Sequence, residues 1–299
     1  MVYFRLEKKS KRKGAFGMKV KISADSTCDL TQELIEKYNV GITPLYIVKD
    51  GESFVDGVTI TPEDIYAHVD AGGDICSTAA VSVADYITFF EEQRKTYDAV
   101  VHFCISSEMS SCYQNACIAA QEVDGVYPVD SRNLSDGIGL LVIEAAIMAQ
   151  DETADGAAIK AHVDAKKGKL DVSFVLDTLA YLRKGGRCSA LAALGANLLS
   201  LKPSIEVHDG VMGVAKKYRG QLQKCILQYI RDHLEGRDDI ETDRIFLTDS
   251  RGFTDAELDE MEQTIRACQP FGEVLRSKSG CTISNHCGPH CMGILYFHK

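Results

Sequence analysis

The sequence predicts a two-domain α/β protein, with an N-terminal domain built on a doubly wound, mostly parallel sheet and a C-terminal α+β domain. In residues 18–166, apolar runs of strand length alternate with helical patterns, which is typical of a parallel sheet with helices on both faces. From residue 167 onward, hairpin and turn signals replace that alternation. The chain has 299 residues, enough for two such domains, and we expect them at 18–166 and 167–299.

The composition is that of an ordinary soluble globular protein, with 45% apolar and 25% charged residues. The longest apolar run, Ile138–Ala149, contains Glu144 and is too short to span a bilayer. No apolar segment follows the basic start, so we expect no secretory signal. The eleven cysteines are an odd number scattered through apolar patterns, which favours a reducing compartment over a disulfide framework. We therefore expect a cytoplasmic protein without integral membrane association.

Charge is distributed unevenly along the chain. Residues 1–17 hold six basic side chains against Glu7, a balance of +5 within a net charge of −10. We expect this stretch to be a basic disordered extension and leave it out of the fold. The remainder then carries −15, which is a poor surface for a phosphate backbone, so no nucleic-acid partner is expected.

The N-terminal domain is predicted around the strand Ala99–Ile105, an almost continuous apolar run of the kind found in strands covered on both faces. Ser111 and Gln114 have the spacing of a capping box at the start of the next helix, Cys112–Gln121. Thr61 before Pro62, and Ser82, are predicted caps of two further helices. The other expected elements are the strands Val20–Ala24, Ile42–Val48 and Gly125–Val129, the extended segment Cys76–Val81, and the helices Thr31–Tyr38, Leu134–Ala149 and Ala154–Ala165.

In the C-terminal domain, Asp209-Gly210 between two strand patterns predicts a hairpin of residues 204–207 and 211–217. Lys184-Gly185-Gly186-Arg187 is read as a turn. The remaining expected elements are the strands Asp171–Leu176, Arg244–Thr248, Glu273–Leu275 and Gly293–Phe297, and the helices Leu191–Leu201, Leu222–Leu234 and Asp255–Cys268.

The loop Ser106–Ser111 is the first candidate for a functional site. It is rich in hydroxyls and lies between the carboxyl end of a buried strand and a helix N-terminus, a place suited to an anion. On the loop alone, simple capping of the helix is the more favoured interpretation. The sequence contains no P-loop or nucleophile elbow, and the Gly137-x-Gly139 pair lacks the third glycine of a dinucleotide fingerprint.

The sequence offers two alternative sites. A serine hydrolase could use Ser107 and His286, although neither an orienting acid nor an oxyanion motif is evident. The C-terminal run holding Cys281, His286, Cys287, His290 and Cys291 could bind zinc, but only one short ligand spacing is present where structural sites show two pairs. A loop with incidental thiols is the favoured interpretation there.

Four segments together carry a family resemblance. They are, in order, Asp25-Ser26-Thr27-x-Asp29-Leu30, then Ser106-Ser107-x-Met109-Ser110-Ser111-x-Tyr113-Gln114-x-Ala116, then Leu179-x-Tyr181-Leu182-x-Lys184-Gly185-Gly186-Arg187-x-Ser189 with Asn197-Leu198-Leu199-x-Leu201-Lys202-Pro203, and finally Ile283-x-x-His286-x-Gly288-Pro289. From Met18 to the C-terminus, the chain resembles the DegV family of bacterial fatty-acid-binding proteins, which includes the carrier subunits of fatty acid kinase.

The resemblance implies a non-enzymatic carrier with one long-chain fatty acid, such as palmitate, stearate or oleate, in a tunnel between the domains, and no further cofactor. Its carboxylate would be held by hydroxyls that match Thr78 and Ser107, with Ser106 beside them. Arg187 and His286 match the family's hydrogen-bond network near that head group. A separate ATP-dependent kinase subunit would convert the bound acid into an acyl phosphate.

The sequence departs from the family pattern at three places. Ala79-Ala80-Val81 follows Thr78 where the family has Ser-Gln-Pro, Ser111 replaces a loop glycine, and His290 replaces the glycine after Pro289. The threonine and the paired serines are kept, so the resemblance still implies an anion site.

Overall fold

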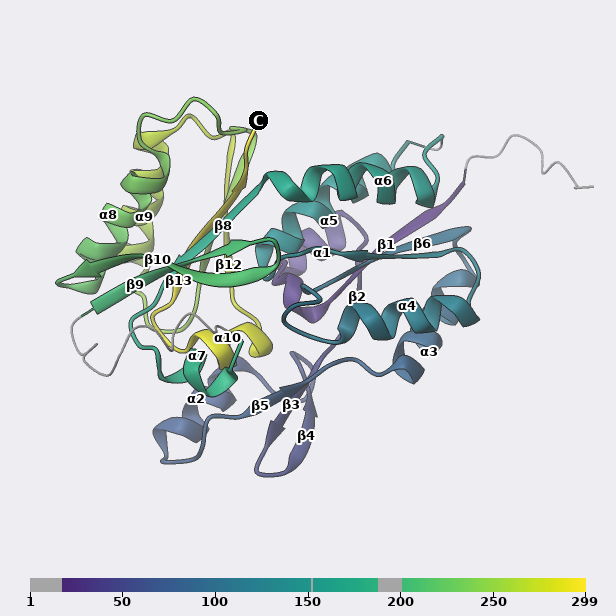
Figure 1. Cartoon of the computed structure of the whole chain (residues 1–299), viewed down its shortest axis with the longest axis horizontal. Helices are drawn as coiled ribbons and strands as arrows, with labels where there is room; N and C mark the ends of the chain where they lie inside the picture. Colours follow the sequence, from purple (N-terminus) through teal and green to yellow (C-terminus); the bar gives the residue numbers. More distant parts are fainter. Residues whose placement is uncertain (1–17, 152, 188–200) are drawn as a thin grey trace, which may run out of the picture.

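The computed structural model describes residues 18–151, 153–187 and 201–299, and its N-terminal half contains the expected parallel sheet (Figure 1). The strand order is β2-β1-β6-β7, and every neighbouring pair runs parallel. The strands are β1 (Val20–Asp25), β2 (Gly41–Thr43), β6 (Ala99–Cys104) and β7 (Val126–Asp130). All six residues of β6 are buried, which explains why this strand reads as a continuous apolar run.

Helices cover both faces of this sheet. In Figure 1, α5 (Asp136–Met148) and α6 (Gly156–Lys166) lie above it, and α3 (Val83–Arg94) and α4 (Cys112–Glu122) lie below it. A shorter helix, α1 (Gln32–Lys37), follows the turn η1 (Ser26–Cys28). The prediction of a doubly wound, mostly parallel sheet is confirmed.

The C-terminal half forms a six-stranded mixed sheet of order β10-β9-β8-β13-β11-β12, preceded by the turn η2 (Lys167–Lys169). Its strands are β8 (Leu170–Val175), β9 (Leu201–His208), β10 (Val211–Arg219), β11 (Arg244–Asp249), β12 (Glu273–Lys278) and β13 (Met292–Phe297). The helices α8 (Leu222–Leu234) and α9 (Asp255–Cys268) pack on one face with a core of their own. The expected hairpin and both helices are confirmed, and the domain limits of 18–166 and 167–299 stay a prediction.

A third sheet, of order β4-β3-β5, was not expected. It consists of β3 (Tyr46–Lys49), β4 (Glu52–Val55) and β5 (Ser77–Ala79) and is accompanied by α2 (Pro62–Asp70). The single strand predicted at Ile42–Val48 is therefore wrong: the chain leaves the parallel sheet after β2, and Pro44, which has no N–H to donate, lies at the break. The predicted helix start, with Thr61 as the N-cap before Pro62, is confirmed, and the structure adds a capping box between Thr61 and Asp64.

Three further local predictions need correction or lie outside the structure. Ser111 does not cap α4 with its side chain; instead Ser110 Oγ accepts from Cys112 N at 3.3 Å. Residues 281–287, read as a loop, form the helix α10 (Cys281–Cys287). The apolar helix expected at Leu191–Leu201 lies outside the described residues except for Leu201, which begins β9. Within the described ranges, no helix combines the length and apolar character needed to cross a bilayer.

The helix α5 joins the two halves. Ten of its thirteen residues are buried, and it contacts β1 and β6 on one side and β8 and β13 on the other. At its first turn, Asp136 Oδ2 accepts hydrogen bonds from Thr248 Oγ1 (2.7 Å) and from Ser277 Oγ, both on the C-terminal sheet. Burial raises the pKa of Asp136 to about 7, although the two hydroxyls act against this shift.

This pKa gives a testable pH dependence. Because Asp136 has a raised pKa in the folded state, the stability that it contributes is present below its ordinary pKa of 3.8 and is lost as the pH rises through about 7. The Asp136→Asn variant lacks this titration. The free energy of unfolding of the variant minus that of wild type should therefore increase by roughly 2 kcal/mol between pH 5 and pH 7.5. Urea unfolding at both pH values measures the difference. The exposed Asp124→Asn is the control, and an equal difference at both pH values would contradict the prediction.

Candidate functional site

A cavity of about 50 Å³ lies between the two halves of the molecule. Residues from both halves line it, and most of them are apolar: Leu45, Thr78, Ala79, Ala80, Ile105, Met109, Ser110, Leu134, Leu182, Arg187, Met212, Thr282, Ile283, His286 and Cys287. A second cavity of about 20 Å³ lies beside it, and residues of β8 and β13 line it. The two share Leu134, Ile283 and Cys287 as lining residues, so we call them together the interdomain channel, made of an outer and an inner cavity.

The polar groups of the outer cavity meet at Thr78 and His286. Thr78 Oγ1, on β5, and His286 Nε2, on α10, are 3.0 Å apart. Burial, with a smaller effect from the nearby Arg187 guanidinium, lowers the pKa of His286 to about 4. His286 is therefore neutral at pH 7, and Arg187 supplies the positive charge at this place. The structure thus brings together three of the five predicted site residues.

The helix α10 holds His286 in place because the other half of the molecule caps its first turn. Gly280 N donates to Asp29 Oδ1 (2.9 Å), and Cys281 N and Thr282 N donate to the two carboxylate oxygens of Asp56 (3.1 and 3.2 Å). These N–H groups have no partner within the helix, so the two carboxylates satisfy them. The small sheet, through Asp56, and the parallel sheet, through Asp29, fix the start of the helix.

Two glycines let α10 approach α7 (Ala180–Gly185) closely. A Cβ built on Gly185 would lie 2.1 Å from His286 Nδ1, and one built on Gly288 would lie 2.6 Å from the ring of Tyr181. The Lys-Gly-Gly-Arg motif and the His-x-Gly-Pro motif therefore lie against each other, and their glycines make this close contact possible. Gly186, with φ 69°, then turns the chain toward Arg187, whose Nε and Nη1 donate to Met109 O (3.4 Å) and to Gly185 O (2.5 Å).

The structure does not bring Ser106 and Ser107 to this channel. Ser106 Oγ donates to Gly210 O (2.8 Å) at the tip of the β9–β10 hairpin, and Ser107 Oγ donates to Asp130 Oδ2 (2.6 Å). The backbone turns directly after β6, because Met109 N and Ser110 N both donate to Ser106 O. This turn directs Met109 and Ser110 toward the cavity in place of the paired serines.

The geometry does not support the two alternative sites. Ser107 is hydrogen-bonded to Asp130 and Arg132, whereas His286 is paired with Thr78, so the contact that a Ser107–His286 hydrolase requires is missing. The C-terminal Cys/His run does not converge either, since Cys281 Sγ donates to Ile60 O. Among the described residues, no three His, Cys, Asp or Glu side chains are placed to hold a metal ion.

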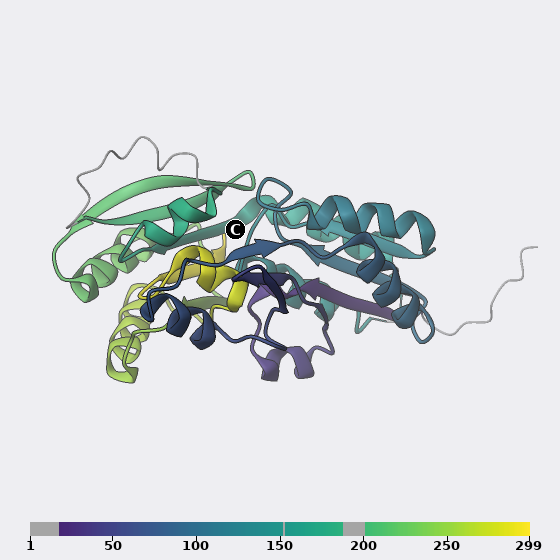
Figure 2. The same ribbon diagram turned by 90° about the horizontal axis from the view of Figure 1, so that it is seen from below.

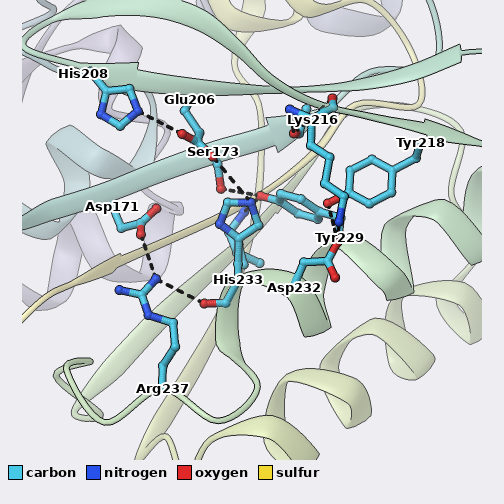
Figure 3. Close-up of polar contacts among 12 residues, drawn as sticks. Asp171, Ser173, Glu206, His208, Lys216, Tyr218, Tyr229, Asp232, His233 and Arg237 are labelled. Carbon is cyan, nitrogen blue, oxygen red and sulfur yellow. Dashed lines mark hydrogen bonds and ion pairs between the residues drawn. The ribbon is translucent and has the colours of Figure 1, made fainter.

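A larger cavity, of about 620 Å³, lies on the C-terminal half, and charged residues line it (Figure 3). Its three carboxylates are already paired: Glu206 with His208 (2.9 Å), Asp232 with Lys216 (2.6 Å), and Asp171 with Arg237 (3.4 Å). The Lys216–Asp232 pair links β10 to α8, and Arg237 follows α8. We therefore interpret this cluster as a set of structural ion pairs that stabilises the packing of the hairpin, β8 and α8.

Comparison with known proteins decides the family. The family model DegV, described as an uncharacterised protein family, matches residues 19–299. The chain belongs to the DegV family. A DegV domain-containing protein of Caldanaerobacter subterraneus subsp. tengcongensis is 33% identical to it over 286 residues, which cover 94% of this chain and 99% of that protein. The resemblance inferred from four short motifs is thereby confirmed.

Solved structures of other proteins share the fold. A DegV family protein from Thermus thermophilus, described as fatty-acid-binding, aligns with a TM-score of 0.83 at 29% identity and covers 94% of this chain and 100% of its own. A stearic-acid-binding protein from Eubacterium ventriosum aligns with a TM-score of 0.80 at 27% identity, covering 94% and 98% of the two chains. A Thermotoga maritima protein, described as having a fatty acid binding function, reaches 0.78 at 27% identity, covering 94% and 99%.

Several residues of this candidate site were not predicted. Ser110 and Met109 lie in the motif loop, so the loop was found but its inward-facing residues were not. Asp29 belongs to the first motif and follows the first strand, and this position is the sequence feature that could have identified it as a functional residue. Met212 and Asp56 lie outside all four motifs, and no local pattern marks them.

The contact between Gly185 and His286 generates a prediction. Gly185→Ala places a methyl group where the imidazole lies, so His286 must move away from Thr78. We expect the free energy of unfolding to fall by about 1 kcal/mol or more, the equivalent of one lost hydrogen bond. Gly168→Ala is the matched control because a Cβ at Gly168 meets nothing within 4 Å. Urea unfolding measures both, and an equal free energy of unfolding in the two variants would contradict the prediction.

Proposed function

We propose that the protein binds one long-chain fatty acid in the interdomain channel, with the carboxylate at Thr78, Ser110, Arg187 and His286. The observation that carries the proposal is the channel itself, an apolar cavity between the two halves with a hydroxyl, an imidazole and a guanidinium at one place. The structural neighbours described as fatty-acid-binding support it through their shared fold.

The head group needs these polar residues because a carboxylate taken out of water must be hydrogen-bonded or paired. His286 Nδ1 is enclosed and has no partner among the described residues, whereas Nε2 faces Thr78. We place the proton on Nε2, from which Thr78 Oγ1 accepts a hydrogen bond, because a proton on Nδ1 would leave a buried N–H donor without a partner among the described residues. The hydroxyl hydrogen of Thr78 is then free to be donated to the carboxylate, and Arg187 balances its charge.

The acyl tail supplies most of the binding energy. About 15 methylenes at ~0.8 kcal/mol each give roughly 12 kcal/mol before the costs of ordering and association are subtracted. The cavities of about 50 and 20 Å³ are smaller than the ~300 Å³ or more typical of small-molecule sites. Binding must therefore move side chains of the wall. Met109 and Met212 are suited to this because methionine is unbranched and adapts its shape.

We further propose that the protein is a cytoplasmic, non-catalytic carrier that presents the bound acid to a separate ATP-dependent kinase subunit. Membership of the DegV family supports this role. The placement of Ser107 against Asp130 also favours a carrier over the alternative, a serine hydrolase that uses Ser107 and His286.

Lipid extraction tests the binding proposal. Protein purified from bacteria should release fatty acid into an organic extract, and mass spectrometry should detect about one equivalent per chain. Protein that has been stripped of lipid should recover the same amount from oleate or palmitate. A chain that stays lipid-free after both treatments would rule the proposal out.

Threonine-to-valine variants test the head-group site. Thr78→Val should weaken oleate binding about tenfold, because one hydrogen bond to the carboxylate is lost while the side chain keeps its volume. Thr88→Val is the control, since Thr88 is exposed on α3. Ser107→Ala separates the two versions of the site: unchanged affinity agrees with the observed geometry, and a loss as large as that of Thr78→Val would restore Ser107 as a head-group ligand.

A further inference from the structure

The inner cavity of the channel has hydroxyl-bearing residues in its lining, which an unsubstituted hydrocarbon tail does not need. Ser135, Thr248 and Ser279 line it, and each of the three is no more than 6% exposed. Ser279 directly precedes the cap of α10. Figure 1 shows α10 in yellow between the C-terminal sheet and the small sheet, and Figure 2 shows the same yellow segment near the centre of the molecule.

The hydroxyl of Ser279 has no hydrogen-bond partner among the described residues, whereas its backbone is fully engaged. Ser279 N donates to Asp249 O (2.9 Å), which extends the β11–β12 ladder by one residue, and Ser279 O accepts from Ser284 Oγ (3.0 Å). Side chains alternate along an extended chain, so Ser279 faces the same side as Ser277. Ser277 Oγ donates to Thr248 Oγ1 (3.1 Å), a residue of the cavity lining. The free hydroxyl is therefore directed to the inner cavity.

The two neighbouring hydroxyls offer the complementary hydrogen-bonding function. Thr248 Oγ1 donates to Asp136 Oδ2 (2.7 Å). Ser135 Oγ donates to Asp29 Oδ2 (2.5 Å). Each has thereby used its one hydrogen and keeps acceptor capacity, because a hydroxyl has one donor and two acceptor sites. The cavity thus provides a free donor at Ser279 and two acceptors. A hydroxyl group matches this set because it both accepts and donates, whereas a ketone only accepts and a methylene does neither.

We propose that the channel is selective for long-chain fatty acids that carry a hydroxyl group near the middle of the chain, and that Ser279 recognises this hydroxyl. The inference rests on the proposed function, because that function places the acyl chain in the channel. The oxygen of the ligand hydroxyl accepts from Ser279 Oγ, and its hydrogen is donated to Ser135 or Thr248.

The position of the hydroxyl on the acyl chain follows from the helix between the two polar places. Ser279 lies two residues before α10, and His286 is the sixth residue of that helix. At about 1.5 Å per residue, Ser279 is roughly 10 Å along the helix from the proposed head-group site. An extended eighteen-carbon acid reaches this distance near its middle carbons.

The size of the inner cavity also agrees with one hydroxyl. Its volume of about 20 Å³ admits one water-sized group, for which about 10–15 Å³ is needed. A plain acyl chain that fills this space leaves the Ser279 hydroxyl buried without a partner, which lowers affinity. In a wholly apolar channel the ligand hydroxyl is the group left without a partner, and it weakens binding. The sign of the difference in affinity between a hydroxylated and a plain chain therefore decides between the two cases.

The test uses the full chain, stripped of lipid, with stearic acid and three hydroxystearic acids whose hydroxyl is at carbon nine, ten or twelve. Competition against a fluorescent fatty acid measures each dissociation constant. At least one hydroxystearic acid should bind about tenfold more tightly than stearic acid, the equivalent of one gained hydrogen bond. If all three bind equally well or more weakly, this inference is overturned and the proposed function stands. A protein that binds none of the four acids overturns both.

Variants of Ser279 provide a second readout. In Ser279→Ala, the ratio of the two affinities should fall from about ten to about one, because the free donor is gone. The ratio is insensitive to a general loss of stability, since both ligands bind the same folded protein. Ser53→Ala is the control, because Ser53 is exposed on β4, and it should keep the wild-type ratio. A ratio that stays near ten in Ser279→Ala, or that falls equally in Ser53→Ala, would remove Ser279 from the proposal.

Discussion

The site depends on the hydrogen bonds that Asp29 and Asp56 accept from the start of α10. A helix of seven residues has little stability by itself, and its first N–H groups have no partner within it. Carboxylates from the other half of the molecule supply those partners. The same short helix then brings His286 to Thr78 and contributes Cys287 to the lining of both cavities. One capping arrangement therefore fixes both the relation of the two halves and the polar end of the channel between them.

The sequence was most informative where an element determines its own structure. The apolar run Ala99–Ile105 and the N-cap Thr61 before Pro62 predict β6 and the start of α2 because burial and local hydrogen bonds produce them. The small sheet and α10 could not be found in this way. The chain changes sheets at Pro44 within one apolar pattern, and α10 is capped by aspartates more than 200 residues away in sequence. Long-range hydrogen bonds leave no periodic signal.

The same distinction applies to the site. Motif resemblance indicated Thr78, Arg187 and His286, and the structure brings all three to one cavity. The hydroxyl loop was also found, but which of its serines faces inward depends on the turn that follows β6. Ser107 is hydrogen-bonded to Asp130 at the end of β7, whereas Ser110 faces the channel. Sequence spacing identifies such a loop, whereas the neighbouring strand decides the orientation of each hydroxyl.

The tight contact between Gly185 and the ring of His286 has an evolutionary consequence. Any larger residue at position 185 leaves no room for an imidazole at position 286, although about one hundred residues separate the two along the chain. Related proteins are expected to keep this pair together or to lose it together. Coordinated substitution at positions 185 and 286 would then distinguish lineages in which this part of the channel has changed from lineages that have kept the ancestral arrangement.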